Sequence, residues 1–303
     1  MGRYRKSLPA HLQEFLQRER QCNDDVLKST TQVQRCLSAS PLPCEMLNET
    51  IELEIVDEIV TGYAQKAQVV RCSSPSLQTK KPIVAKIFDP LYMPFESREF
   101  RGVPRDPLRA ADDRFSTEAS AYEELNSHFG GGLIPEYFGS WRLEFPLLDK
   151  FRTVFLVLME FIPGISLRQF DPERCTRDER LNLLSKVMEA NIAMHYVGVS
   201  HNDLAPRNIF CDRDEIGDPD LKIRIVDFDI ARLSRYLGYE ALSSKQPLPP
   251  SPIQYYHRNY IITMPEWADY RSDHRANLEW MRSIWGGSTA YMPVEEDLLQ
   301  DFD

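Results

Sequence analysis

Two short segments in the second half of the sequence carry the residues best suited to chemistry. Residues 197–208 read Val-Gly-Val-Ser-His-Asn-Asp-Leu-Ala-Pro-Arg-Asn and contain Asp203 and Asn208, whereas residues 225–229 read Ile-Val-Asp-Phe-Asp and contain Asp227. A carboxylate can take the proton of a hydroxyl group, and carboxylate and amide oxygens bind Mg²⁺. Transfer of a phosphoryl group to a hydroxyl requires this combination of groups.

Taken one at a time, these residues have simpler explanations. Asp203 could cap a turn, Asn208 could support its own backbone, and Asp227 could end a strand. Together, with Gly198 before them, they resemble the protein-kinase catalytic loop H-R-D-x-x-x-x-N and the D-F-G motif that follows it. The resemblance implies that Asp203 is the catalytic base and that Asn208 and Asp227 bind Mg²⁺. It also implies that His201 braces the loop from below.

A protein-kinase-like chain also needs a strand-borne lysine that touches the nucleotide phosphates and a helix-borne glutamate that holds this lysine. Lys86, at the end of Val-Ala-Lys, is similar to the lysine of the V-A-x-K strand. For its partner we prefer Glu118, because Tyr122 and Leu125 share its inward face at helical spacing. The competing candidates are Glu123 and Glu124.

Two further segments are similar to the parts of a kinase that surround ATP. Residues 62–69 keep the frame of the glycine-rich loop, but Ala64 and Ala67 replace two glycines, so nucleotide affinity is expected to be modest. Residues 156–164 resemble the hinge between the lobes, with Met159 as gatekeeper and Glu160 to Ile162 offering backbone groups to adenine. The nucleotide-binding residues implied by resemblance are Gly62, Ala64, Val69, Ala85, Lys86, Met159, Glu160 and Ile162.

The catalytic segments also depart from the protein-kinase pattern. Asn202 replaces the arginine of H-R-D, so control by phosphorylation of an activation loop is not expected. Ala205 replaces the lysine of serine/threonine kinases, whereas Arg207 stands where tyrosine kinases place an arginine and could neutralise transition-state charge. Asp229 replaces the glycine of D-F-G, which reduces the freedom of the loop.

The elements that must position these residues follow from hydrophobic periodicity. Alternation predicts strands, an Ala-rich segment predicts a helix around Glu118, and an apolar stripe predicts a helix over residues 180–197. The expected strands cover residues 51–56, 67–72, 82–88, 137–145 and 153–159, and a last helix covers residues 266–285. Strands give way to helices near residue 162, where a nucleotide cleft is expected.

We therefore expect an α+β, bilobal, protein-kinase-like fold. Residues 1–46 form a helical or partly disordered extension. Residues 47–162 form a small lobe with an antiparallel sheet and one key helix. Residues 163–303 form a mainly helical, shortened second lobe that contains the catalytic loop; Met264-Pro-Glu-Trp267 echoes the A-P-E motif there.

Composition limits the function classes. The 303 residues carry a net charge of −10, which argues against a nucleic-acid-binding surface, and 42% hydrophobic residues argue against a disordered chain. Six scattered cysteines favour a reducing compartment, and no apolar stretch has the length of a signal peptide or membrane span. We expect a cytoplasmic or nuclear monomer without membrane or nucleic-acid partners.

The resemblance implies three functions. The first is a kinase that transfers phosphate from Mg-ATP to a protein hydroxyl, in a chain similar to the atypical protein-kinase-like proteins of fungi. The second is a small-molecule kinase of the aminoglycoside or choline kinase type, motivated by the missing D-F-G glycine and the short region after Asp229. The third is a pseudokinase that acts as a binding module, motivated by Ala64, Ala67 and Ala205.

Overall fold

A computed structural model describes residues 2–5, 29–38, 45–63, 65–94, 106–211, 216–218, 220–257, 264, 267 and 274–295. The chain forms two compact units. The first comprises Met1–Glu123 and Glu136–Phe161, and the second comprises Glu124–Pro135 and Ile162–Asp303.

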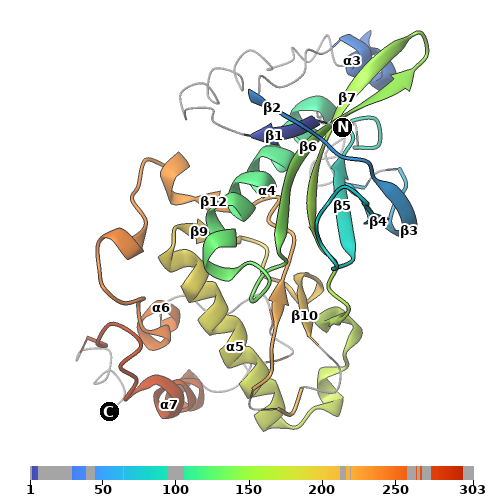
Figure 1. The fold of residues 1–303 in the computed structure, drawn as a ribbon. Helices are drawn as coiled ribbons and strands as arrows, with labels where there is room; N and C mark the ends of the chain where they lie inside the picture. The colour runs from blue at the N-terminus through green and yellow to red at the C-terminus, as the bar shows by residue number, and fades with distance from the viewer. Residues whose placement is uncertain are drawn as a thin grey trace. The chain divides into compact units, whose positions relative to one another are not determined.

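The first unit is built on a seven-stranded sheet of the order β2-β1-β6-β7-β5-β4-β3, in which every pairing between described strands is antiparallel. Figure 1 shows β5, β4 and β3 following one another toward one edge. The elements are β1 (Gly2–Arg5), α3 (Gln32–Ser38), β2 (Glu45–Thr50), β3 (Glu54–Val60), β4 (Gln68–Ser73), β5 (Ile83–Phe88), α4 (Pro107–Phe129), β6 (Tyr137–Leu147) and β7 (Lys150–Glu160).

The strand β5 separates two apolar layers, because its side chains alternate between the faces of the sheet. Ile83 and Ala85 join a cluster with Val70, Trp141 and Leu158. Phe88 points to the opposite face and lies edge-on to Phe115 of α4, at 5.9 Å between ring centroids. Phe115 in turn stacks on Phe155 of β7 at 4.9 Å. This aromatic contact fixes α4 against the face of β5 that also carries Lys86.

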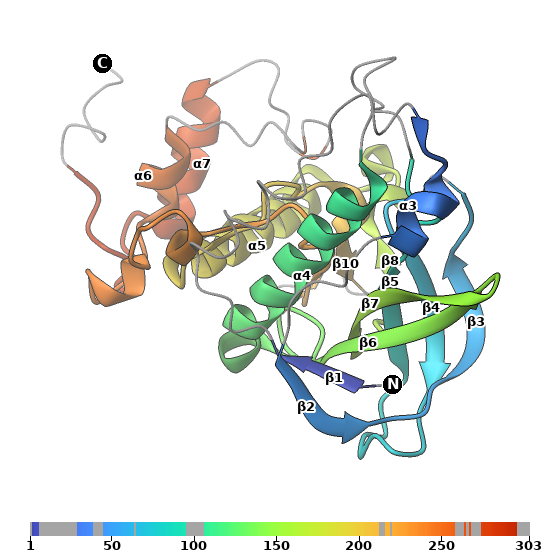
Figure 2. The ribbon, with the colours of Figure 1, turned by 90° about the horizontal axis from the view of Figure 1, so that it is seen from above.

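The second unit is centred on the helix α5 (Arg177–Tyr196). Its buried apolar stripe of Leu181, Leu184, Met188 and Ile192 packs against α6 (Pro252–His257) and α7 (His274–Trp285), which lie side by side in Figures 1 and 2. The remaining elements are β8 (Ile165–Ser166), η1 (Leu167–Gln169), η2 (Pro172–Arg174), β9 (Val199–Ser200), η3 (Pro206–Asn208), β10 (Ile209–Cys211), β11 (Arg224–Ile225), β12 (Arg232–Leu233), η5 (Ser234–Tyr236) and η6 (Leu242–Ser244).

Two small antiparallel sheets hold the segment that follows α5. One has the strand order β11-β10-β8, and the other pairs β12 with β9. The chain leaves α5 through Gly198, whose φ of +96° is in the region that only glycine adopts readily. This turn directs β9 into the loop that carries Asp203.

The α+β class expected from the sequence is confirmed. The expected strands correspond to β3, β4, β5, β6 and β7, with ends shifted by a few residues, and the helix around Glu118 extends over Pro107–Phe129. In the segment expected to be a helical or partly disordered extension, Gly2–Arg5 is a strand between β2 and β6, and Gln32–Ser38 is a helix. The last helix begins at His274, and most of the preceding residues from 266 lie outside the described part of the chain. The domain boundaries expected at residues 46 and 162 remain predictions.

The N-terminus of α5 is stabilised by a local contact, and this helix leads to the loop that carries Asp203. Thr176 and Glu179 form a capping box, in which the Thr176 hydroxyl accepts a hydrogen bond from the Glu179 N–H. Thr176→Ala should lower the free energy of unfolding by about 1 kcal/mol, as measured by urea titration. Thr176→Ser keeps the hydroxyl and should remain close to wild type; an equal loss in both variants would contradict this role.

The same box predicts a pH dependence. The backbone N–H and the hydroxyl of Thr176 lower the pKa of the Glu179 carboxyl. Because this pKa is depressed in the folded state, its stabilisation is present above the unfolded pKa and is lost as the pH falls through the folded one. The difference between wild type and Thr176→Ala should therefore shrink in acid.

Candidate active site

The first unit contains a buried ion pair between Lys86 and Glu118. The Lys86 ammonium donates to Glu118 Oε2 at 2.5 Å, and the two side chains are 10% and 0% exposed. The Phe88–Phe115 contact explains why they meet. Lys86 lies two residues before Phe88 on the strand, and Glu118 lies three residues after Phe115 on the helix, so both point into the space between β5 and α4. Glu118, rather than Glu123 or Glu124, is thus the partner of Lys86.

The end of β7 carries the residues expected to face adenine. Met159 Sδ accepts a hydrogen bond of 3.3 Å from the hydroxyl of Tyr122, and the Tyr122 ring stacks on Tyr137 at 5.7 Å. The Glu160 N–H donates to the Glu136 carbonyl at 2.9 Å, and the Phe161 N–H donates to the Pro82 carbonyl at 2.8 Å. These two N–H groups are therefore committed within the first unit.

The turn between β3 and β4 corresponds to the expected glycine-rich loop. Gly62 has a φ of +112°, which requires glycine. The carboxamide of Gln68 reaches back across the turn, accepting from the Gly62 N–H at 2.7 Å and donating to its carbonyl at 3.0 Å. The side chain of Gln68 thus makes the pair of hydrogen bonds that a backbone residue would otherwise make across this turn. Val69 follows at once and pairs with Lys86 of β5, whereas Ala64 lies outside the described residues.

In the second unit, Asp203 is held by two side chains from the next turn. Arg207 donates to both carboxylate oxygens of Asp203 through one guanidinium nitrogen, Nη2. Asn208 is buried, and its Nδ2 donates to the Asp203 carbonyl at 2.8 Å and to Oδ2 at 3.3 Å. These bonds orient the carboxylate and commit the nitrogen of the Asn208 amide. Its oxygen is the atom that suits a metal ion.

A second set of contacts connects this loop to Asp227. The Val226 N–H donates to the Asn208 carbonyl at 3.0 Å, and the Val226 carbonyl lies 3.0 Å from His201 Nε2. The Asp203 N–H donates to His201 Nδ1 at 3.2 Å, so Nε2 carries the proton and donates to Val226. His201 is buried and braces the loop as expected. Asn208 lies immediately before β10 and Asp227 lies two residues after β11, and these two strands pair with each other.

Both of these segments contain a residue with an unusual backbone conformation. Asn202 and Asp227 have φ values of +61° and +71°, which non-glycine residues adopt infrequently. Asn202 Nδ2 donates to the Ile230 carbonyl at 3.1 Å, and the Phe228 ring lies 4.7 Å from the His201 ring. Asn202, which stands where protein kinases have an arginine, therefore ties the loop directly to the segment after Asp227. Asp229 is buried in that segment.

The first unit thus brings together Gly62, Val69, Ala85, Lys86, Glu118, Met159 and Glu160, while the second brings together Asp203, Arg207, Asn208 and Asp227 and also contains Ile162. Sequence reasoning missed the contacts of Gln68 and Asn202, because both join a side chain to a backbone group that only the folded chain brings near. Within the described ranges, no group of three or more His, Cys, Asp or Glu side chains is placed so that it could hold a metal ion. No helix in the described part of the chain is long and apolar enough to cross a membrane.

Two known proteins are similar to parts of this chain. No protein-family model matches the chain. It is 36% identical to the serine/threonine-protein kinase pkn2 of Myxococcus xanthus over 78 residues, which are 25% of this chain and 9% of that protein's length. The solved structure of the PK-1 kinase of Cydia pomonella granulovirus is similar with 14% identity and a TM-score of 0.38, covering 60% of this chain and 53% of that one. The α+β fold described above is consistent with a protein-kinase-like fold.

The buried pair predicts a non-additive response to mutation. Lys86→Met should lower the free energy of unfolding by about 3 kcal/mol, because it leaves the Glu118 carboxylate buried without its cation. Adding Glu118→Leu should recover part of this loss, since both charges are then gone. Urea titration of the two single variants and the double variant measures the coupling.

The control is an exposed pair on the same helix, Arg109–Asp113, at 3.5 Å. Arg109→Met should change the stability by less than about 1 kcal/mol. If the double variant at Lys86 and Glu118 lost the sum of the two single effects, the pair would not be coupled.

Proposed function

We propose that this chain is an ATP-dependent phosphotransferase that transfers the γ-phosphate of Mg-ATP to a hydroxyl group of a protein. The observation that carries the proposal is the catalytic loop of the second unit. There, Arg207 and Asn208 orient the Asp203 carboxylate, and Val226, immediately before Asp227, is bonded to both Asn208 and His201. This network supports the proposal that Asp203 is the base and that Asn208 and Asp227 are the metal ligands, because it fixes Asp203, Asn208 and the residue before Asp227.

In this proposal Asp203 accepts the proton of the acceptor hydroxyl as its oxygen attacks the γ-phosphorus, and ADP leaves. Arg207 keeps the carboxylate in one direction and places a positive charge where negative charge develops in the transition state. Mg²⁺ bound by the Asn208 oxygen and the Asp227 carboxylate would neutralise phosphate charge. The strain at Asp227 is consistent with a carboxylate held ready for a ligand.

The first unit would hold the nucleotide. Lys86, oriented by Glu118, would contact the phosphates, while Gly62 and its neighbours would cover them. Val69, Ala85 and Met159 would line the adenine site. Since the Glu160 N–H is already used, Glu160 would contact adenine through its carbonyl, and Ile162 through its N–H.

The acceptor is the finer part of the proposal. A protein hydroxyl is favoured by the complete set of catalytic residues and by the local similarity to a protein named as a serine/threonine-protein kinase. One alternative is a kinase whose acceptor is a small alcohol, and the other is a pseudokinase that binds ATP without transferring phosphate. The resemblance to atypical fungal protein-kinase-like proteins is also a proposal. Transfer of labelled γ-phosphate to a panel of proteins, to the chain itself and to small alcohols separates these functions.

Substitutions of Asp203 and Asp227 should affect nucleotide binding and phosphate transfer differently. At a concentration of Mg-ATP about a hundred times its dissociation constant, binding adds ~2.7 kcal/mol and raises the melting temperature by several degrees. Asp203→Ala should keep this shift and lose phosphate transfer, because the base acts on the acceptor. Asp227→Ala should lose both, because the metal then lacks its carboxylate ligand.

Wild type and a surface variant, Asp171→Ala, serve as controls and should show the full shift. If wild type showed no magnesium-dependent shift at millimolar ATP, the enzyme proposal would fail. A full shift without any transfer in wild type would favour the pseudokinase.

A further inference from the structure

Three segments of the first unit meet at the end of β7. Lys81, from the connection before β5, lies 3.0 Å from Glu160 Oε1 and 2.9 Å from Glu136 Oε2. Glu160 Oε2 accepts a further hydrogen bond of 3.1 Å from the Glu136 N–H. The ammonium of Lys81 therefore bridges the carboxylate of Glu160, at the end of β7, and that of Glu136, just before β6.

Burial identifies Glu160 as the centre of this cluster. Its side chain is 13% exposed, compared with 40% for Lys81 and 45% for Glu136. The hydrogen bond to Glu136, followed in size of effect by the one to Glu160, raises the pKa of the Lys81 ammonium, so Lys81 is charged at neutral pH. A carboxylate that is largely removed from water keeps its position more strictly when a cation and an N–H both hold it.

The backbone of the same residues is fixed as well. The Glu160 N–H donates to the Glu136 carbonyl, and the Phe161 N–H donates to the carbonyl of Pro82, next to Lys81. Side-chain and backbone bonds from residues 81, 82 and 136 thus converge on residues 160 and 161. They leave the peptide unit that contains the Glu160 carbonyl little freedom to rotate.

We infer that Lys81 is a positioning residue that, through Glu160, fixes the Glu160 carbonyl and thereby makes the nucleotide site selective for adenine over guanine. The inference rests on the proposed function, which assigns this carbonyl to the adenine base. Adenine offers an amino N–H where guanine offers a carbonyl oxygen. A fixed acceptor therefore bonds to adenine and repels guanine, whereas a peptide that can rotate discriminates less.

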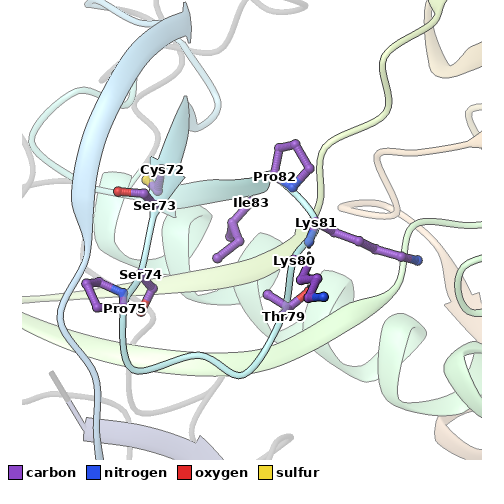
Figure 3. Close-up of a pocket in the computed structure, with 9 residues that line it drawn as sticks. All are labelled: Cys72, Ser73, Ser74, Pro75, Thr79, Lys80, Lys81, Pro82 and Ile83. Atoms are coloured by element: carbon purple, nitrogen blue, oxygen red, sulfur yellow. Dashed lines mark hydrogen bonds between the residues drawn. The ribbon is translucent and has the colours of Figure 1, made fainter.

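Lys80 provides a matched control. Figure 3 shows Lys80 and Lys81 leaving adjacent positions of the β4–β5 connection in different directions. Both residues border a pocket of ≈ 380 Å³, together with Ser73, Ser74 and Thr79. The side chain of Lys80 is exposed, so replacing it removes the same charge from the same connection without touching Glu160.

The test compares Lys81→Met, Lys80→Met and wild type by the dissociation constants of Mg-ATP and Mg-GTP, measured by calorimetry. Lys81→Met should lower the ATP-to-GTP preference about tenfold, the equivalent of one well-made hydrogen bond, chiefly by weakening ATP. Lys80→Met should keep the wild-type preference, and Lys81→Arg should restore most of it. Lys81→Met should fold normally, because partly exposed ion pairs contribute little stability.

The outcomes separate this inference from the proposed function. If wild type prefers ATP and Lys81→Met keeps that preference, or if Lys80→Met loses it equally, the inference is overturned while the proposed function stands. If wild type binds neither nucleotide, the proposed function fails and the inference fails with it. Loss of preference in Lys81→Met alone supports both.

Discussion

The burial of one lysine and one glutamate between β5 and α4 constrains the whole first unit. Lys86 and Glu118 stabilise each other's charged form in that layer, where removing a single charge from water costs several kcal/mol. Their meeting depends on the register of β5 in the sheet and on the rotation of α4 about its axis. The aromatic contacts of Phe88, Phe115 and Phe155 fix that rotation from one side, and the sheet pairing fixes the strand from the other.

In the second unit, carboxylate residues are held in segments whose backbone is strained. Positive φ values at Gly198, Asn202 and Asp227 turn the chain sharply, and two of them fall on residues with a Cβ. Hydrogen bonds between side chains and backbone groups offset this strain. His201 bonds to the Val226 carbonyl and to the Asp203 N–H, Asn208 donates to the Asp203 carbonyl, and Asn202 donates to the Ile230 carbonyl. In place of an arginine that would read a phosphate, this chain has an asparagine that ties the loop together.

Much of this arrangement could be predicted from the sequence because it depends on local periodicity. The helix α5 buries the stripe that a 3.6-residue repeat predicts, formed by Leu181, Leu184, Met188 and Ile192. The alternation in β5 places Lys86 on the opposite face of the sheet from Ala85. Gly2–Arg5 could not be recognised as a strand, since its partners in β2 and β6 are distant in sequence. The role of Lys81 was missed for the same reason, and that of Gln68 because its bonds to Gly62 depend on the conformation of the turn between them.

The central claim is the proposed binding of Mg-ATP, with Lys86 on a phosphate group and with Asn208 and Asp227 on the metal ion, and the most direct measurement is a crystal structure of the full chain with Mg²⁺ and a non-hydrolysable ATP analogue. The account predicts a phosphate oxygen within hydrogen-bond distance of Lys86 Nζ, and a metal ion on the same nucleotide coordinated by Asn208 Oδ1 and the Asp227 carboxylate. Nucleotide bound away from Lys86, or a metal ion that neither Asn208 nor Asp227 contacts, would contradict it.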